Sequence, residues 1–184
     1  MSMTESLELA VLSDVVSRLE LAGFDYMLTG SVAMNYYAEP RMTRDIDIVV
    51  ALAGTDAGKV IEIFQDTYYL SPDAVIDAVR DHKIFNIVHY ESVVKVDLIV
   101  RKESEYRQLE FNRRRPIEVG ELVTWIVSKE DLILSKLLWA QDSRSELQLN
   151  DVRNLLATKP DLDYLREWSP QLGLDLMLEE CLNE

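Results

Sequence analysis

The spacing of apolar residues in the first third of the chain predicts a helix, a strand, a second helix and a second strand. Apolar residues recur at helical spacing until a glycine ends the run, at Leu7, Val11, Val15 and Leu19 and then Gly23. Residues 26–29 have the length of a strand, and residues 31–37 follow a glycine turn as a short helix. A further strand is predicted over 45–52.

The middle of the chain predicts two short helices and a hairpin. Gly54-Thr55-Asp56 provides a stop and an N-cap for a helix over 57–66. Ser71-Pro72-Asp73 caps a second helix, with proline at its first position. Residues 84–90 and 93–101 then read as the two strands of a hairpin.

A short helix, further strands and a helical tail complete the predicted order, which indicates an α+β fold with a mixed β-sheet flanked by helices. Ser128 to Asp131 has the cap-and-acid spacing of a helix start, and residues 132–139 are apolar almost all round, so this helix is expected to be mostly buried. We expect a core domain over 1–126 and a C-terminal helical segment over 127–184 packed on it.

Composition is that of an ordinary globular protein. The chain has 184 residues, of which 48% are hydrophobic and 28% charged, enough for one core with a small helical appendage. Its longest apolar stretches have strand length or are broken by charge, so no membrane association is expected. The acidic N-terminus lacks the basic region of a signal peptide, which predicts a cytoplasmic protein.

The net charge of −14 argues against broad affinity for nucleic-acid backbone, because such binding depends on Lys and Arg. One local exception is the segment 101–115, which carries six basic against three acidic side chains. Two interpretations stay open for it: a solvated charged face, or a contact surface for phosphate or RNA.

Two aspartates in the predicted strand at 45–52 are candidate metal ligands. Asp45 and Asp47 share one face of the strand, roughly 6 to 7 Å apart along it, while Ile46 and Ile48 face the other way. Asp97, on another apolar strand, would be a third carboxylate. Mg²⁺ prefers oxygen ligands and completes its shell with water and substrate phosphates. The alternative is a half-exposed strand with solvated carboxylates.

Gly30 and Ser31 close an apolar strand and open a helix. Free backbone N–H groups and the positive end of the helix dipole favour phosphate at such a place, and glycine allows close approach. The alternative is an ordinary strand-to-helix turn.

In this order and spacing, the glycine turn, Asp45-Ile-Asp47 and the later Asp97 resemble the DNA polymerase beta-like nucleotidyltransferases. The resemblance covers about residues 24 to 156. More narrowly, the chain is similar to the small bacterial nucleotidyltransferases that include AbiEii-type abortive-infection toxins. The segments that carry this similarity are Arg41-Met-Thr43-Arg44-Asp45-Ile-Asp47, Ser128-Lys-Glu-Asp131-Leu-Ile and Lys136-Leu137.

The resemblance implies an enzyme that moves a nucleoside monophosphate from an NTP to an acceptor hydroxyl and releases pyrophosphate, by a two-metal displacement with Mg²⁺ or Mn²⁺. The implied catalytic and metal-binding residues are Asp45, Asp47 and Asp97, with Asp97 also a candidate to take the hydroxyl proton. The implied nucleotide-binding residues are Gly30 and Ser31 for the phosphates, Arg41, Arg44 and Lys136 for the pyrophosphate charge, Thr43 for the turn, and Asp151.

Lys136 lies inside a predicted buried helix, so its ammonium either reaches outward to water or meets an anion. In the resembling family a lysine at this place contacts the triphosphate, and an aspartate on the next helix, matched here by Asp151, completes the site. Asn150-Asp151-Val-Arg-Asn154 departs from the Arg-Asp-x-x-Asp pattern of toxin-like members. A surface pairing of Asp151 with Arg144 or Arg153 is therefore an equal alternative.

Two further functions stay open. The chain could be a non-catalytic nucleotide-binding or toxin–antitoxin interaction module with a cognate protein partner. It could also be an enzyme whose acceptor is a cationic small molecule such as an aminoglycoside, attracted by the acidic surface. RNA, protein and small molecules are all candidate acceptors.

Overall fold

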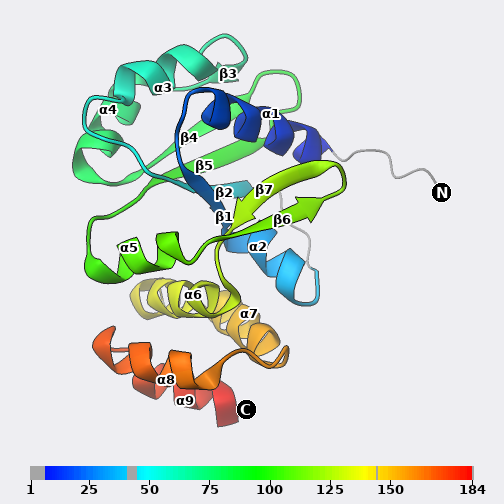
Figure 1. Ribbon diagram of the computed structural model, residues 1–184, viewed down its shortest axis with the longest axis vertical. Coiled ribbons are helices and arrows are strands. Elements are labelled where there is room, and N and C mark those ends of the chain that lie inside the picture. The colour runs from blue at the N-terminus through cyan, green and yellow to red at the C-terminus, as the bar shows by residue number, and fades with distance from the viewer. Residues whose placement is uncertain (1–6, 41–44, 144, 184) are drawn as a thin grey trace, which may run out of the picture.

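A computed structural model describes residues 7–40, 45–143 and 145–183 (Figure 1). The helices are α1 (Leu7–Leu21), α2 (Gly30–Tyr37), α3 (Ala57–Phe64), α4 (Pro72–Asp81), α5 (Glu105–Asn112), α6 (Lys129–Ser143), α7 (Glu146–Leu156), α8 (Leu162–Gln171) and α9 (Asp175–Asn183). The strands are β1 (Tyr26–Thr29), β2 (Asp45–Val50), β3 (Tyr68–Tyr69), β4 (Ile84–His89), β5 (Lys95–Val100), β6 (Arg115–Val119) and β7 (Leu122–Ile126).

Within the described ranges these strands form one sheet in the order β3-β4-β5-β2-β1-β7-β6. The pairs β2–β5 and β1–β7 are parallel and the other pairs are antiparallel. The sheet is thus mixed and flanked by helices, which confirms the predicted α+β fold. The hairpin predicted from residues 84–101 is present as β4 and β5.

Alternation along the two central strands separates an apolar face from a polar one. In β2, Ile46, Ile48 and Val50 are buried, and in β5 every second residue from Val96 onward is buried as well. Helices α1, α3 and α4 lie on one side of the sheet, and α2, α5 and the C-terminal helices lie on the other (Figure 1). The sheet therefore lies between two layers of helices (Figure 1).

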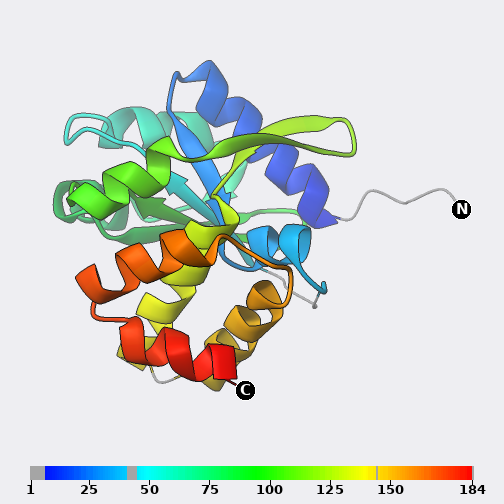
Figure 2. The same ribbon diagram turned by 60° about the horizontal axis from the view of Figure 1, so that its bottom comes forward.

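The C-terminal helices α6 to α9 form a group at one end of the molecule (Figure 2). Residues 131–137 of α6 are all buried, because α6 packs against α2, α7 and α8, whereas Trp139, at the end of the segment expected to be mostly buried, is exposed. The apolar side chains of residues 131–137 join the same hydrophobic core as those of the sheet. No helix in the described ranges has the length and apolar character needed to cross a membrane.

Local hydrogen bonds explain where the predicted helices begin. The Ser71 hydroxyl accepts a bond from the Ala74 N–H, and the Ser128 hydroxyl accepts one from the Asp131 N–H. Asp56 is the N-cap residue of α3, as predicted, but its side chain makes no capping bond. Its carboxylate instead accepts a bond from the backbone N–H of Ala53 at 2.7 Å, because the residue already has helical backbone angles.

Candidate active site

The three aspartates lie on one face of the central strands. Asp47 on β2 is directly opposite Thr29 of β1 and Asp97 of β5, and Asp45 is opposite Lys95. Residues two apart on a strand point to the same face, so Asp45 and Asp47 share their face with Asp97. The side chain of Asp45 is 52% exposed and that of Asp97 only 20%, so the cluster runs from the surface towards the interior.

Asp47 is seated on the turn between β1 and α2. Gly30 has φ +58°, and a Cβ added there would lie 2.0 Å from Asp47 Oδ2, so only glycine leaves room for the carboxylate. The next backbone N–H, of Ser31, donates to the same oxygen at 3.4 Å. The predicted phosphate-binding turn and the predicted metal ligands are therefore in direct contact.

The charge environment of Asp47 is repulsive. Burial raises the pKa of Asp47 to about 6, and the negative charges of Asp97 and Asp45 act in the same direction. The Ser31 N–H and the positive charge of Lys136 lower the pKa but do not cancel these effects. A divalent cation at this place would relieve the repulsion.

Lys95 supplies a positive charge to the cluster. Its Nζ lies 3.2 Å from Asp45 Oδ2 and 3.0 Å from Asp97 Oδ2. The hydrogen bond to Asp97 raises the pKa of Lys95 against the opposing effect of burial, and Asp45 adds to the rise. Sequence reasoning assigned no role to Lys95, although its position two residues before Asp97 places it on the same strand face.

The carboxylate oxygens suit Mg²⁺ or Mn²⁺ by their chemistry, since both are hard cations that prefer oxygen. In the part of the chain that the structure describes, however, no three Asp, Glu, His or Cys side chains are grouped as metal ligands. Lys95 engages two of the aspartates and the turn engages the third. The donor set fits such a cation, and its side chains would have to rearrange to hold one.

Lys136 and Asp151 form a buried ion pair. Lys136 Nζ lies 2.7 Å from Asp151 Oδ2 and 3.1 Å from Gln148 Oε1, and the two charged side chains are 5% and 2% exposed. Lys136 therefore meets an anion and does not extend to water. The expected surface position of Asp151 is wrong, because the residue is buried.

Several of the predicted basic residues either lie outside the described ranges or pair within the chain. Arg41, Thr43 and Arg44, like the proposed partner Arg144, lie outside the described residues. The basic segment 101–115 does not form a single open patch, because its arginines make intramolecular contacts: Arg101 with Glu103, Arg107 with Glu110 and Ser135, Arg113 with Asp131, Arg114 with Asp25, and Arg115 with the Tyr37 hydroxyl.

No protein-family model matches the sequence, and no curated protein does. Solved structures resemble the fold. The lincosamide antibiotic adenylyltransferase LnuA, solved with lincomycin, is 16% identical, with a TM-score of 0.56 over 80% of this chain and 96% of its own. A nucleotidyltransferase-like protein from Paracoccidioides brasiliensis is 17% identical, with a TM-score of 0.57 over 94% of each chain.

The antibiotic-resistance factor ANT(2'')-Ia is 11% identical, with a TM-score of 0.62 over 96% of this chain and 98% of its own. Another structure of ANT(2'')-Ia contains adenylyl-2''-tobramycin. At these identities the similarity establishes the fold, which is that of nucleotidyltransferases, in agreement with the predicted fold class.

Proposed function

We propose that this protein is a nucleotidyltransferase, an enzyme that transfers a nucleoside monophosphate from an NTP to an acceptor hydroxyl with release of pyrophosphate. The observation that carries the proposal is the seating of Asp47 on the Gly30–Ser31 turn, with Asp45 and Asp97 on the same face. Burying Asp47 beside two like charges disfavours its ionised form and raises its pKa. Such an arrangement is typical of a functional site and is not expected of three acids with a purely structural role.

In this proposal Asp45, Asp47 and Asp97 hold Mg²⁺ or Mn²⁺. When bound, such a cation polarises phosphoryl oxygens and lowers the pKa of the attacking hydroxyl, and two of them would do so on both sides of the transferred group. Asp97 is less exposed than Asp45, the other aspartate paired with Lys95, and it is the candidate to accept the hydroxyl proton.

The remaining residues bind the nucleotide. The Ser31 N–H, in the first turn of α2, faces the carboxylate cluster, and together with the Gly30 N–H it would receive the phosphates. Lys136 is near enough to lower the pKa of Asp47, so its ammonium can offset charge on the pyrophosphate, with Asp151 positioning it. Arg41 and Arg44 are proposed for the same charge and Thr43 for the turn.

The proposed ligands of the cation and of the nucleotide come from two parts of the chain. We propose that residues 1–126 carry the carboxylates and the phosphate turn, and that residues 127–184 bring Lys136 to the nucleotide. Helix α6 contacts α2 directly, which gives the second part a fixed position beside the turn.

For the acceptor we propose a cationic small molecule with a free hydroxyl. The net charge of −14 would attract a cation, and the arginines of segment 101–115 are engaged within the chain. LnuA and ANT(2'')-Ia, which share the fold, were solved with lincomycin and with adenylyl-2''-tobramycin. The alternative is a toxin–antitoxin role with RNA or protein as acceptor, and the experiment must distinguish it from transfer to a small molecule.

The test is incubation with each labelled NTP and Mg²⁺ or Mn²⁺, in parallel with an aminoglycoside, a lincosamide, total RNA and a protein extract. We expect label in a small molecule and none with Asp47→Asn. Label in RNA or protein alone would overturn the proposed acceptor and favour the toxin-type alternative. Absence of label from every acceptor would favour a non-catalytic nucleotide-binding module.

Nucleotide binding should also depend on a divalent cation, because three carboxylates and a triphosphate repel one another. Calorimetry with ATP, GTP, CTP and UTP would show binding with Mg²⁺ or Mn²⁺ and none in excess chelator. Tight binding of any NTP in chelator would contradict the site as assigned.

A further inference from the structure

Lys95 lies within the carboxylate cluster, yet the proposed transfer gives it no task. Strands β2 and β5 run parallel, so Lys95 stands opposite Asp45, while Asp97 follows two residues later on the same face. Nζ of Lys95 lies within 3.2 Å of both carboxylates. One ammonium therefore bridges two acids that would otherwise repel each other.

The third carboxylate is held elsewhere. Asp47 Oδ2 faces Gly30 and accepts the Ser31 N–H, on the side of the turn. Across the described residues, no three acidic, histidine or cysteine side chains are grouped as metal ligands. One oxygen of Asp45 and one of Asp97, Oδ2 in each, already accept Lys95.

We propose that Lys95 is a built-in counter-cation that holds Asp45 and Asp97 together until a divalent cation displaces it. Lys95 thereby sets the cation concentration at which the site becomes loaded. The inference deepens the proposed function and rests on it for the assignment of the carboxylates as cation ligands.

The exposure of the three side chains explains why the ammonium can be displaced. Lys95 is 37% exposed, Asp45 52% and Asp97 20%, so both ion pairs are partly solvated and each is weak. A divalent cation carries twice the charge and binds carboxylate oxygens directly. Removing Lys95 would remove the two ion pairs that compete with the cation, and cation binding should then be about 3-fold to 30-fold tighter.

The experiment measures Mn²⁺ binding to the full chain without nucleotide, from the electron paramagnetic resonance signal of free Mn²⁺. We expect the dissociation constant of Lys95→Met to be about 3-fold to 30-fold lower than that of the parent. Lys95→Arg keeps the positive charge and should bind Mn²⁺ no more tightly than the parent. In chelator, Lys95→Met should melt below the parent, and added Mn²⁺ should raise its melting temperature by more.

Lys83→Met is the matched control. Lys83 also pairs with an exposed acid, Asp81, at 3.1 Å, but it precedes β4 at the end of the sheet away from Lys95. Its removal changes the net charge equally and should leave Mn²⁺ affinity at the parental value. If Lys95→Met does not fold, Lys95→Gln removes the charge while keeping a polar side chain and takes its place.

Each result decides the proposal. Equal Mn²⁺ affinity in the parent and Lys95→Met would overturn it while leaving the cation site of the proposed function intact. An equal gain in Lys83→Met would also overturn it, because the effect would then be one of net charge. No Mn²⁺ binding by the parent or Lys95→Met would overturn both the role of Lys95 and the proposed cation site.

Discussion

At the scale of single residues, Asp47 is the most constrained member of the site. It contacts the Gly30–Ser31 turn and stands opposite Asp97 on the neighbouring strand, and the absence of a side chain at Gly30 leaves room for its carboxylate. Such a residue carries a cost in the cation-free protein, because its ionised form is buried among like charges. Removing the charge of Asp47 should therefore change the free energy of unfolding.

Asp47→Asn should abolish nucleotidyl transfer and keep or raise stability at neutral pH. The amide removes a cation ligand and also removes a buried charge, so at pH 7.5 in chelator the free energy of unfolding should rise by on the order of 1 to 3 kcal/mol. Urea denaturation and the labelled-NTP assay measure the two effects. A marked loss of stability, with activity reduced only in proportion to folded protein, would make Asp47 structural.

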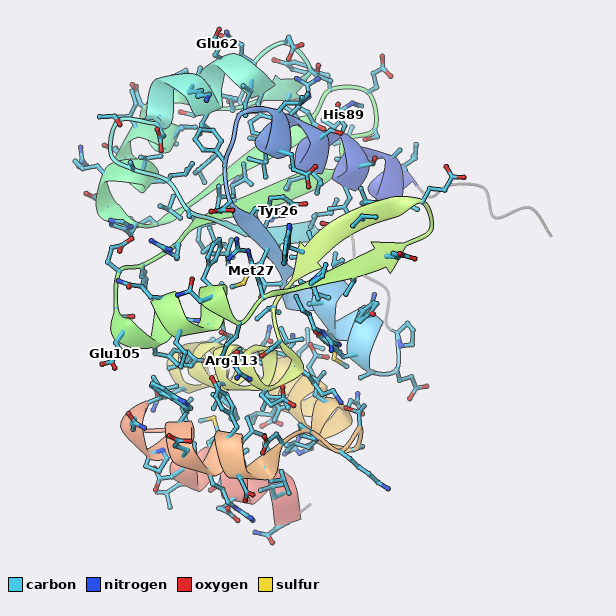
Figure 3. The ribbon with its side chains drawn as sticks, viewed as in Figure 1. Tyr26, Met27, Glu62, His89, Glu105 and Arg113 are labelled. Atoms are coloured by element: carbon cyan, nitrogen blue, oxygen red, sulfur yellow. The ribbon has the colours of Figure 1, made fainter. Side chains whose placement is uncertain are left out.

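The same substitution has a pH signature. The pKa of Asp47 is about 6 in the folded protein, above the value of an unfolded aspartate, so the folded state holds the proton more tightly. This group therefore favours folding increasingly as pH falls through about 6 towards about 4, and that contribution is lost as pH rises. The stability advantage of Asp47→Asn should accordingly shrink between pH 7.5 and pH 4.5. Glu62→Gln is the control, since Glu62 lies on the outer surface of α3 (Figure 3).

Gly30→Ala should damage both the turn and the site. A Cβ at φ +58° is strained, and it would meet Asp47 Oδ2 at 2.0 Å, so we expect a loss of roughly 1 to 3 kcal/mol of stability and loss of nucleotide binding. Gly54→Ala is the matched control, because a Cβ at Gly54 would meet nothing within 4 Å. Thermal melts and NTP calorimetry compare the two variants. Parental nucleotide affinity in folded Gly30→Ala would show that the close fit at this turn is not needed.

At the scale of elements, the hairpin of α6 and α7 is organised around the ion pair of Lys136 and Asp151. Sequence alone predicts that Lys136→Met leaves folding nearly unchanged, because methionine keeps the apolar stem. The ion pair reverses this expectation. Removing the lysine breaks the 2.7 Å ion pair with the buried Asp151, and breaking a buried ion pair costs roughly 3 to 5 kcal/mol in comparable cases.

A double variant separates folding from nucleotide contact. In Lys136→Met with Asp151→Leu both charges are removed, so folding should be close to that of the parent, whereas Lys136→Met alone should be strongly destabilised. If Lys136 contacts the triphosphate, nucleotide affinity of the double variant should fall by about 1 to 3 kcal/mol, measured by calorimetry with Mg²⁺. Lys102→Met, at an exposed site, is the control. Unchanged affinity in the double variant would confine the nucleotide site to the strands and α2.

At the scale of the whole molecule, Asp131 links the C-terminal helices to the sheet domain. Its fully buried carboxylate accepts bonds from Tyr164 of α8 at 2.6 Å, from Ser128 at 2.6 Å and from Arg113 at 2.9 Å. Arg113, labelled in Figure 3, also stacks on the Tyr164 ring at 3.9 Å. Residues from three separate parts of the chain thus converge on one acid.

Asp131→Asn should loosen this junction. An amide presents N–H groups to donors that need an acceptor, so we expect a loss of roughly 2 to 4 kcal/mol in urea denaturation and faster hydrogen exchange in α8 and α9. Glu167→Gln, on the exposed side of α8, should change stability by less than about 0.5 kcal/mol. Unchanged exchange in α8 and α9 of Asp131→Asn would show that apolar packing alone holds these helices.

The sequence by itself determined most of the elements, although not the short strand β3, and the face of the sheet that carries Asp45, Asp47 and Asp97. These features depend on periodicity and on contacts between close neighbours, such as the cap that Ser71 makes to Ala74, so the chain specifies them locally. Asp56 takes the predicted N-cap position of α3, but its carboxylate accepts the Ala53 N–H instead of making a capping bond.

Only the tertiary structure decided which charges meet. Lys136 pairs with Asp151 on another helix, Lys95 with Asp45 on another strand, and Arg113 with Asp131. Each charge could have been satisfied by water or by several other partners, and nothing in the local sequence chooses among them. The choice is made by the packing of strands and helices, which fixes the distances between residues far apart in the chain and removes the water that would otherwise solvate them.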